Sequence, residues 1–185
     1  GNEPIFGFTS YNDAKGKELN KGLDLKGGIN VILQISVKDI LKGLAENSKN
    51  PAFNKALVQA DVLQASTNDP YIESFFVAFE SLKGDQQLAA PDLFANRTLS
   101  DEITFQMSDS EVQPILRNKV DESIISAFEV LRKRIDKFGV TQPNIQRLGT
   151  SGRILVELPG AKDVDRVKNL LQSTAQLEFW ETYKN

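Results

Sequence analysis

The sequence predicts a mixed α+β fold in which an antiparallel sheet packs against amphipathic helices. Short segments with alternating apolar and polar residues, the pattern of half-buried strands, occur on both sides of one long segment. That long segment carries an apolar residue every three to four positions, which is the pattern of a helix. A hydrophobic fraction of 40% in 185 residues suffices for a core. The length fits one large domain or two small ones.

The N-terminal third contains one clear strand, at residues 29–37. Its apolar side chains recur at every second position, so one face of the strand should be buried. These apolar positions are Ile29, Val31, Leu33, Ile35 and Val37.

Residues 38–100 are predicted to be helical. Three segments with helical spacing lie near 39–47, 52–65 and 70–84. The last one carries Phe75, Phe76 and Phe79, which we expect to pack on a neighbouring helix; a peptide-binding groove is the alternative.

From residue 101 onward the predicted elements follow the order β-α-β-β-α-β. This order is that of the ferredoxin-like fold, a split β-α-β arrangement with an antiparallel sheet. The long helix ends at Gly139, a natural helix stop, and a second helix covers residues 163–173. The strands are expected at 102–108, 144–148, 153–158 and 176–182.

One apolar stripe along the long helix should face this sheet. Its side chains recur at the spacing of one helix face, and we expect them in the core. They are Leu116, Val120, Ile124, Ala127, Phe128, Leu131, Ile135 and Phe138.

Three regions follow from this order of elements. Residues 1–37 form an N-terminal segment with an additional strand, because a lone strand with so much apolar surface must join a sheet. Residues 38–100 are a helical insertion, and residues 101–185 are the ferredoxin-like base.

Composition excludes several classes of function. The net charge is −3, from 22 basic and 25 acidic residues, whereas a general nucleic-acid binder needs a basic excess. Without His or Cys there is no imidazole base, thiol nucleophile, disulfide or common zinc site. No believable nucleophile–base pair appears, so the sequence predicts no enzyme, no metal and no cofactor.

Two local motifs suggest chemistry at first sight. The glycines at residues 22–28 suggest a phosphate loop, but they lead into a strand rather than a helix, so a turn is the better interpretation. The basic run Arg132-Lys133-Arg134 with Lys137 suggests contact with lipid or RNA. At helical spacing its charges fan around the helix, and the default is a solvated face.

Three stretches together resemble the SecD family of bacterial protein-export membrane proteins. The first is Gly22-Leu23-Asp24-Leu25-Lys26-Gly27-Gly28, directly before a strand. The second runs from Arg132 through 140–147 to Arg153-Ile154-Leu155-Val156-Glu157-Leu158-Pro159-Gly160, and the third is Ala175-Gln176-Leu177-Glu178-Phe179. Their order and spacing agree with the family, and residues 38–100 resemble it least.

The resemblance implies a fragment of a larger protein. It implies the base of the first periplasmic region of SecD, or of a SecDF fusion, in a parent embedded in the inner membrane. The parent is similar to resistance–nodulation–division transporters and helps to export preproteins with the proton gradient. Its implied partners are SecF, the SecY channel complex and unfolded preproteins. The motif residues Gly22, Leu23, Asp24, Leu25, Gly27, Gly28, Pro159 and Gly160 are expected to be structural.

A partner should join the sheet through an edge strand. Two strands are candidates, Ile29–Val37 and Asn144-Ile145-Gln146-Arg147-Leu148. The second is favoured because it lies at the border of the sheet in the usual ferredoxin-like strand order, whereas the apolar residues of 29–37 suffice for that strand to be largely covered within the chain. A free-standing ligand-binding or regulatory module on a ferredoxin-like sheet is the alternative function. That alternative follows because the fold by itself predicts no function.

Overall fold

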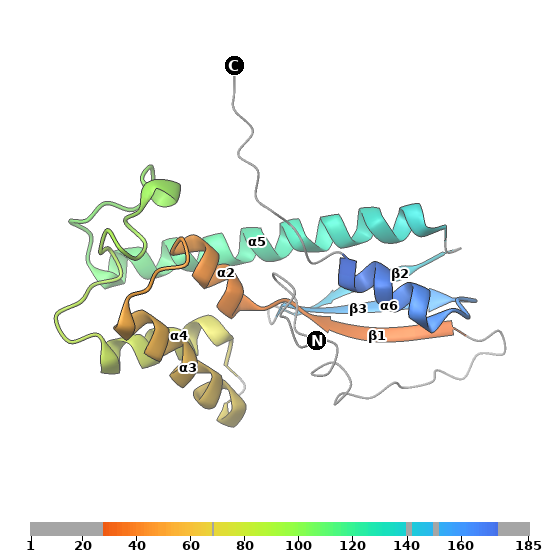
Figure 1. Ribbon diagram of the computed structural model, residues 1–185, viewed down its shortest axis with the longest axis horizontal. Coiled ribbons are helices and arrows are strands. Elements are labelled where there is room, and N and C mark those ends of the chain that lie inside the picture. Colours follow the sequence, from red (N-terminus) through yellow and green to blue (C-terminus); the bar gives the residue numbers. More distant parts are fainter. Residues whose placement is uncertain (1–27, 68, 140–141, 150–151, 174–185) are drawn as a thin grey trace, which may run out of the picture. The chain divides into compact units, whose positions relative to one another are not determined.

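The computed structural model describes residues 28–67, 69–139, 142–149 and 152–173, which form a mixed α+β fold (Figure 1). By contacts the chain divides into two compact units. The sheet unit comprises Gly1–Ser36 and Ser126–Asn185, and the helical unit comprises Val37–Ile125. The elements in chain order are β1 (Gly28–Gln34), α2 (Val37–Leu44), α3 (Pro51–Ser66), α4 (Tyr71–Leu82), the 3₁₀ helix η1 (Arg97–Leu99), α5 (Asp109–Phe138), β2 (Asn144–Leu148), β3 (Arg153–Pro159) and α6 (Val164–Ser173).

The described strands of the sheet unit form an antiparallel sheet in the order β1-β3-β2. The strand predicted at residues 29–37 is confirmed as far as Gln34, and its apolar positions lie opposite the apolar positions of β3 and share one face with them. Its predicted end is wrong, because Val37 is the first residue of α2. The paired residues are Ile29 with Leu158, Val31 with Val156 and Leu33 with Ile154. The three β3 side chains of these pairs are buried, so this face is the core face of the sheet.

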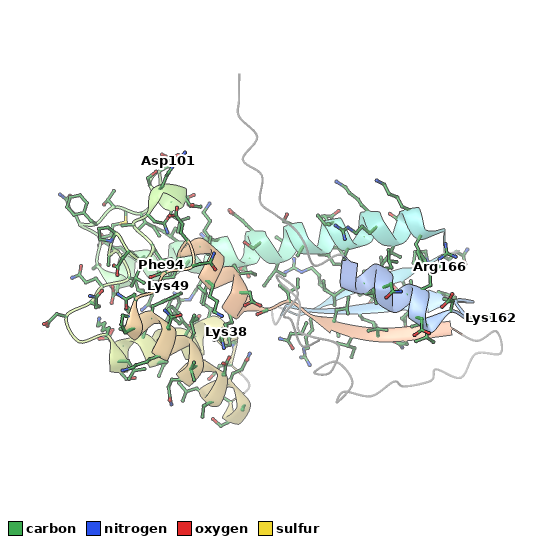
Figure 2. The ribbon with its side chains drawn as sticks, in the orientation of Figure 1. Lys38, Lys49, Phe94, Asp101, Lys162 and Arg166 are labelled. Atoms are coloured by element: carbon green, nitrogen blue, oxygen red, sulfur yellow. The ribbon has the colours of Figure 1, made fainter. Side chains whose placement is uncertain are left out.

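The C-terminal part of α5 and α6 supply the helical side chains of this unit. Leu131 and Ile135 of α5 and Val167 of α6 are buried. Arg166 of α6, labelled in Figure 2, places its guanidinium carbon 4.6 Å from the ring centroid of Phe138. The predicted apolar stripe of α5 is largely buried, but Phe128 and Phe138 are only half-buried. Its residues Leu116, Val120 and Ile124 belong to the helical unit, so only the part from Ala127 onward belongs to the sheet unit. Gly139 ends the helix with a φ of +79°, a value that glycine adopts readily.

The helical unit has an aromatic core. Phe75 of α4 and Phe53 of α3 pack edge to face, with ring centroids 5.7 Å apart. Phe94, labelled in Figure 2, meets Phe53 at 5.8 Å and Phe75 at 6.5 Å, again edge to face. The phenylalanines of α4 predicted to pack on a neighbouring helix are indeed buried.

Ion pairs and caps hold the loop before α5 within this unit. Ser108 donates its backbone N–H and its hydroxyl to Glu111, which caps the first turn of α5. Asp109 accepts Lys83 Nζ at 2.7 Å and the backbone N–H of Leu88 at 2.7 Å. The hydrogen bond to Asp109 raises the pKa of the Lys83 ammonium.

The strand predicted at residues 102–108 is wrong. After η1, the N–H of Ile103 bonds to the carbonyl of Leu99 at 2.8 Å, and a turn from Thr104 to Met107 follows. Ile103 is 1% exposed whereas Phe105 is 67% exposed, so the two do not share a buried face. The alternating pattern has no neighbouring strand to pair with among the described residues, and local turns satisfy the backbone instead.

This correction changes the role of β1. It is one of the three described strands and pairs along its whole length with β3, rather than adding to a sheet that begins at residue 102. Between β1 and β2 the chain forms helices, and β3 then lies between these two strands. The strand predicted at residues 176–182 lies outside the described residues.

Candidate functional site at the edge of the sheet

The predicted partner edge, Asn144–Leu148, is strand β2 and lies at one border of the described sheet. A strand residue directs its N–H and its C=O to the same side, and successive residues alternate sides. The N–H of Ile35 donates to the carbonyl of Gly152 at 2.9 Å, so these two directly opposed residues form a hydrogen-bonded pair. Together with the register of the strands, this pair determines which residues of β1, β2 and β3 form hydrogen-bonded pairs.

The backbone groups that point out of the sheet follow from this register. Residues 154, 156 and 158 of β3 bond to β1, so 153, 155 and 157 bond to β2. Their partners in β2 are Leu148, Gln146 and Asn144. Ile145 and Arg147 therefore point their N–H and C=O groups away from β3, which makes them the open groups of the predicted edge.

The side chains of these two residues lie on the core face of the sheet. Ile145 is opposite Val156 and half-buried, whereas Arg147 is opposite Ile154 and exposed. Ile154 and Val156 are fully buried, so a guanidinium cannot turn inward between them without losing its hydration. In the described part of the chain Arg147 forms no ion pair.

A polar row crosses the opposite face of the sheet. Glu157 of β3 accepts Asn30 Nδ2 of β1 at 3.3 Å and Asn144 Nδ2 of β2 at 2.5 Å. Gln146 Nε2 in turn donates to Asn144 Oδ1 at 3.0 Å. This row was not predicted, although polar residues at the outward positions of three strands are a sequence signal for it. The row ties β2 to the sheet and leaves Gln146 exposed at the border.

Two of the family motifs meet at one end of the sheet. Gly28 is directly opposite Pro159, and a Cβ at Gly28 would lie 3.1 Å from the carbonyl oxygen of Leu158. Gly160 follows with a φ of +73°, where glycine is favoured. The expected structural role of these positions remains a prediction. The other motif residues, Gly22, Leu23, Asp24, Leu25 and Gly27, lie outside the described residues.

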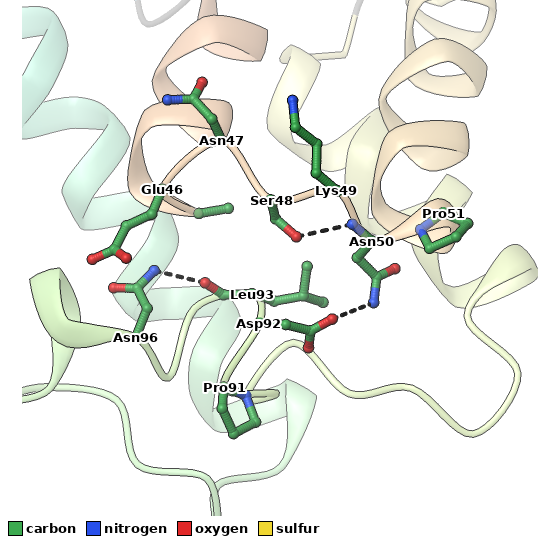
Figure 3. Close-up of a pocket in the computed structure, with 11 residues that line it drawn as sticks. Glu46, Asn47, Ser48, Lys49, Asn50, Pro51, Pro91, Asp92, Leu93 and Asn96 are labelled. Atoms are coloured by element: carbon green, nitrogen blue, oxygen red, sulfur yellow. Dashed lines mark hydrogen bonds between the residues drawn. The ribbon is translucent and has the colours of Figure 1, made fainter.

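The helical unit has an open hollow of about 540 Å³ beside the end of α2 (Figure 3). Asn50 caps α3 by accepting the N–H of Phe53, and it donates to Asp92 at 2.8 Å and to Gln86 at 3.1 Å. Asn96 donates to carbonyls at 2.6 Å, among them that of Leu93. Both asparagines are buried, and no buried polar side-chain atom in the described residues lacks a partner. The hydrogen bonds of these asparagines hold the loops that line the hollow together. Among the described residues they leave no buried polar side-chain atom unpaired that could bind a ligand.

The described residues contain no group of three or more acidic side chains that could hold a metal ion. None of the helices among these residues is long and apolar enough to cross a membrane. The candidate site is the open border of β2, which consists of outward backbone groups, Arg147 and the end of the polar row.

Comparison with known proteins gives the class of protein. Residues 124–184 match the family described as protein translocase subunit SecDF, P1 domain, N-terminal. The chain is 37% identical over 172 residues to the protein translocase subunit SecD of Rhodothermus marinus, covering 93% of this chain and 27% of the relative. SecD of Aquifex aeolicus is 33% identical over 168 residues, covering 87% and 31%. SecD of Escherichia coli is 29% identical over 164 residues, covering 85% and 26%. No solved structure matches the chain.

These matches define a segment of a non-enzymatic subunit of a protein translocase. The chain belongs to the SecD/SecDF family, in the N-terminal part of the P1 domain. The family resemblance predicted from the sequence motifs is confirmed. The chain spans about a quarter to a third of the length of the curated relatives it matches.

Proposed function

We propose that this chain is the periplasmic base of a SecD or SecDF subunit and acts as a scaffold without chemistry of its own. In this proposal the base is ferredoxin-like, and the strand predicted at residues 176–182 belongs to the same sheet. The helices of residues 38–100 are an insertion into this base. The parent protein lies in the inner membrane, resembles resistance–nodulation–division transporters, and couples the proton gradient to the export of preproteins.

The observation that carries the proposal is the open backbone of β2 in a chain of this family. Ile145 and Arg147, which are separated by Gln146, both direct their N–H and C=O groups toward an incoming strand. Exposed groups of this kind are a pairing hazard unless a partner covers them. A sheet of the SecF periplasmic domain, next to the SecY channel, is the partner that we propose, joined by strand addition.

The alternation of β2 provides a sharp test of this joining. Ile145→Pro removes an N–H that points out of the sheet, whereas Gln146→Pro removes one that bonds to β3. We expect Ile145→Pro to weaken co-purification with the SecF periplasmic domain of the same organism about fivefold or more, the worth of roughly one hydrogen bond. We expect Gln146→Pro to lower the stability of the sheet itself.

Ile145→Ala is the matched control, since it removes the side chain and keeps the outward N–H. Circular dichroism should give the same spectrum for the Ile145 variants and the unchanged chain. Placed in the full-length protein, Ile145→Pro should slow preprotein export in cells, and Ile145→Ala should not. Unchanged pairing and export with a folded Ile145→Pro variant would contradict the proposed edge.

A further inference from the structure

We propose that the β2 edge selects an antiparallel strand that carries a carboxylate directly opposite Arg147. This inference rests on the proposed function, because it concerns the same edge, and it adds the chemistry of the occupant. The occupant is an extended acidic segment of another domain rather than an apolar strand or a second copy of this chain.

Arg147 lies on the core face at the open border of the sheet. Its backbone groups point toward the incoming strand, so a residue directly opposite would share its face of the sheet, with Cβ atoms about 5 Å apart. On its own side the neighbours of Arg147 are Ile154 and Val156, both buried and apolar. Charge complementarity for this cation therefore has to come from the strand that is added.

Pairing of β2 with the same strand of a second copy is unfavourable. Two copies of β2 that use both outward residues place Ile145 opposite Arg147 of the other copy. The two Arg147 side chains then lie at diagonal positions on one face, roughly 7–8 Å apart, and like charges at such positions repel. An apolar strand leaves the guanidinium partly desolvated without a partner. A carboxylate opposite Arg147 avoids both the repulsion between like charges and the desolvation of an unpaired guanidinium.

The polar row on the other face of the sheet also reaches the open edge. Its hydrogen bonds run from Gln146 through Asn144 to the Glu157 carboxylate, which fixes the Gln146 side chain beside the open edge. The Gln146 carboxamide oxygen is thereby left to accept from a donor side chain on the added strand. The preferred strand accordingly carries an acid on the core face and a donor on the other face.

The test uses synthetic nine-residue strand peptides of alternating Thr and Val with a central Glu, Gln or Lys, labelled for fluorescence anisotropy with the whole chain. We expect the Glu peptide to bind about threefold more tightly than the Gln peptide, the worth of an exposed ion pair, and the Lys peptide to bind most weakly. Arg147→Gln should abolish this order, Arg147→Glu should reverse it, and high salt should flatten it.

If Arg147 instead protects the edge against pairing, its substitution should change peptide binding in the opposite direction. If Arg147 only guards the edge against pairing, Arg147→Gln binds every peptide more tightly or dimerises in light scattering, and the proposal falls. Absence of binding by every peptide contradicts it as well. Ile145→Pro distinguishes failure of the proposed edge from failure of the carboxylate selection. If it abolishes binding of all three peptides but the unchanged chain shows no charge order, the edge stands and the carboxylate selection fails. If it binds all three as the unchanged chain does, the edge itself fails.

Discussion

The helical unit and the sheet unit satisfy their polar groups in different ways. In the helical unit, side chains such as Asn50, Asn96 and Asp109 bond the loops internally around a core of phenylalanines. In the sheet unit the described core consists mainly of aliphatic side chains, and one strand leaves its outward backbone groups without a partner strand among the described residues. This contrast is consistent with the proposal that the second unit binds a partner.

The family match follows the same division. The matched residues, 124–184, lie almost wholly in the sheet unit, whereas nearly all of the helical unit falls outside them. The relative from Rhodothermus marinus nevertheless aligns with 93% of the chain. The sheet unit is therefore the part of the chain that the family description covers. That description leaves the role of the helical unit open.

The largest effect expected is that of Phe75→Ala in the helical unit. Phe75 is fully buried and contacts the rings of Phe53 and Phe94, so its removal should lower the free energy of unfolding by about 3–5 kcal/mol. Urea unfolding followed by circular dichroism measures this loss. A loss below about 1 kcal/mol would contradict the closed aromatic core.

The same substitution in the sheet unit should cost less. Phe128 belongs to the α5 stripe but is half-buried, so Phe128→Ala should lower the free energy of unfolding by about 1–2 kcal/mol. The two phenylalanine variants, unfolded in parallel, compare the two cores directly. Equal losses in both would remove the contrast between the units.

The hydrogen bonds of Asn50 beside the hollow should contribute about as much to the free energy of unfolding as Phe128 does. Asn50→Ala removes the cap of α3 and the bonds to Gln86 and Asp92, which should destabilise the chain by about 1–2 kcal/mol. Lys49→Ala, at the exposed neighbouring position, is the control and should change stability by less than about 0.5 kcal/mol. If the two variants unfold alike, the hydrogen bonds of Asn50 do not hold the loops together.

The smallest effect is a pH dependence in the helical unit. Arg117 binds both carboxylate oxygens of Glu73, at 2.6 and 2.8 Å, and this hydrogen bonding lowers the pKa of Glu73. Because the folded pKa is the lower one, the stabilisation is present above the unfolded value of about 4.3 and is lost as the pH falls through the folded value.

Both side chains of this pair are 40% exposed, so it is worth less than about 1 kcal/mol. The stability difference between the unchanged chain and Glu73→Gln should accordingly appear at pH 7 and disappear near pH 3. Asp121→Asn is the control, since Asp121 is exposed and forms no ion pair among the described residues. A difference that persists at low pH would assign the effect to packing rather than charge.

The sequence alone determined the elements whose pattern is local. The alternation of residues 29–37, the stripe of α5 and the glycine at 139 specify strand, helix and stop through side-chain periodicity and backbone freedom. The structure confirms the helix and its stop, and it confirms the strand as far as Gln34, whereas Val37 begins α2. The motifs also sufficed for the family, because their order and spacing along the chain are themselves sequence properties.

Only the tertiary structure decided what depends on a neighbour. Residues 102–108 alternate like a strand, yet without an adjacent strand their backbone groups bond within turns, and Phe105 is left exposed. Likewise, the sequence placed the candidate edge at residues 144–148 but could not say which of their N–H groups are open. That follows from the register set by Ile35 and Gly152, and a register is a property of two paired strands rather than of either sequence.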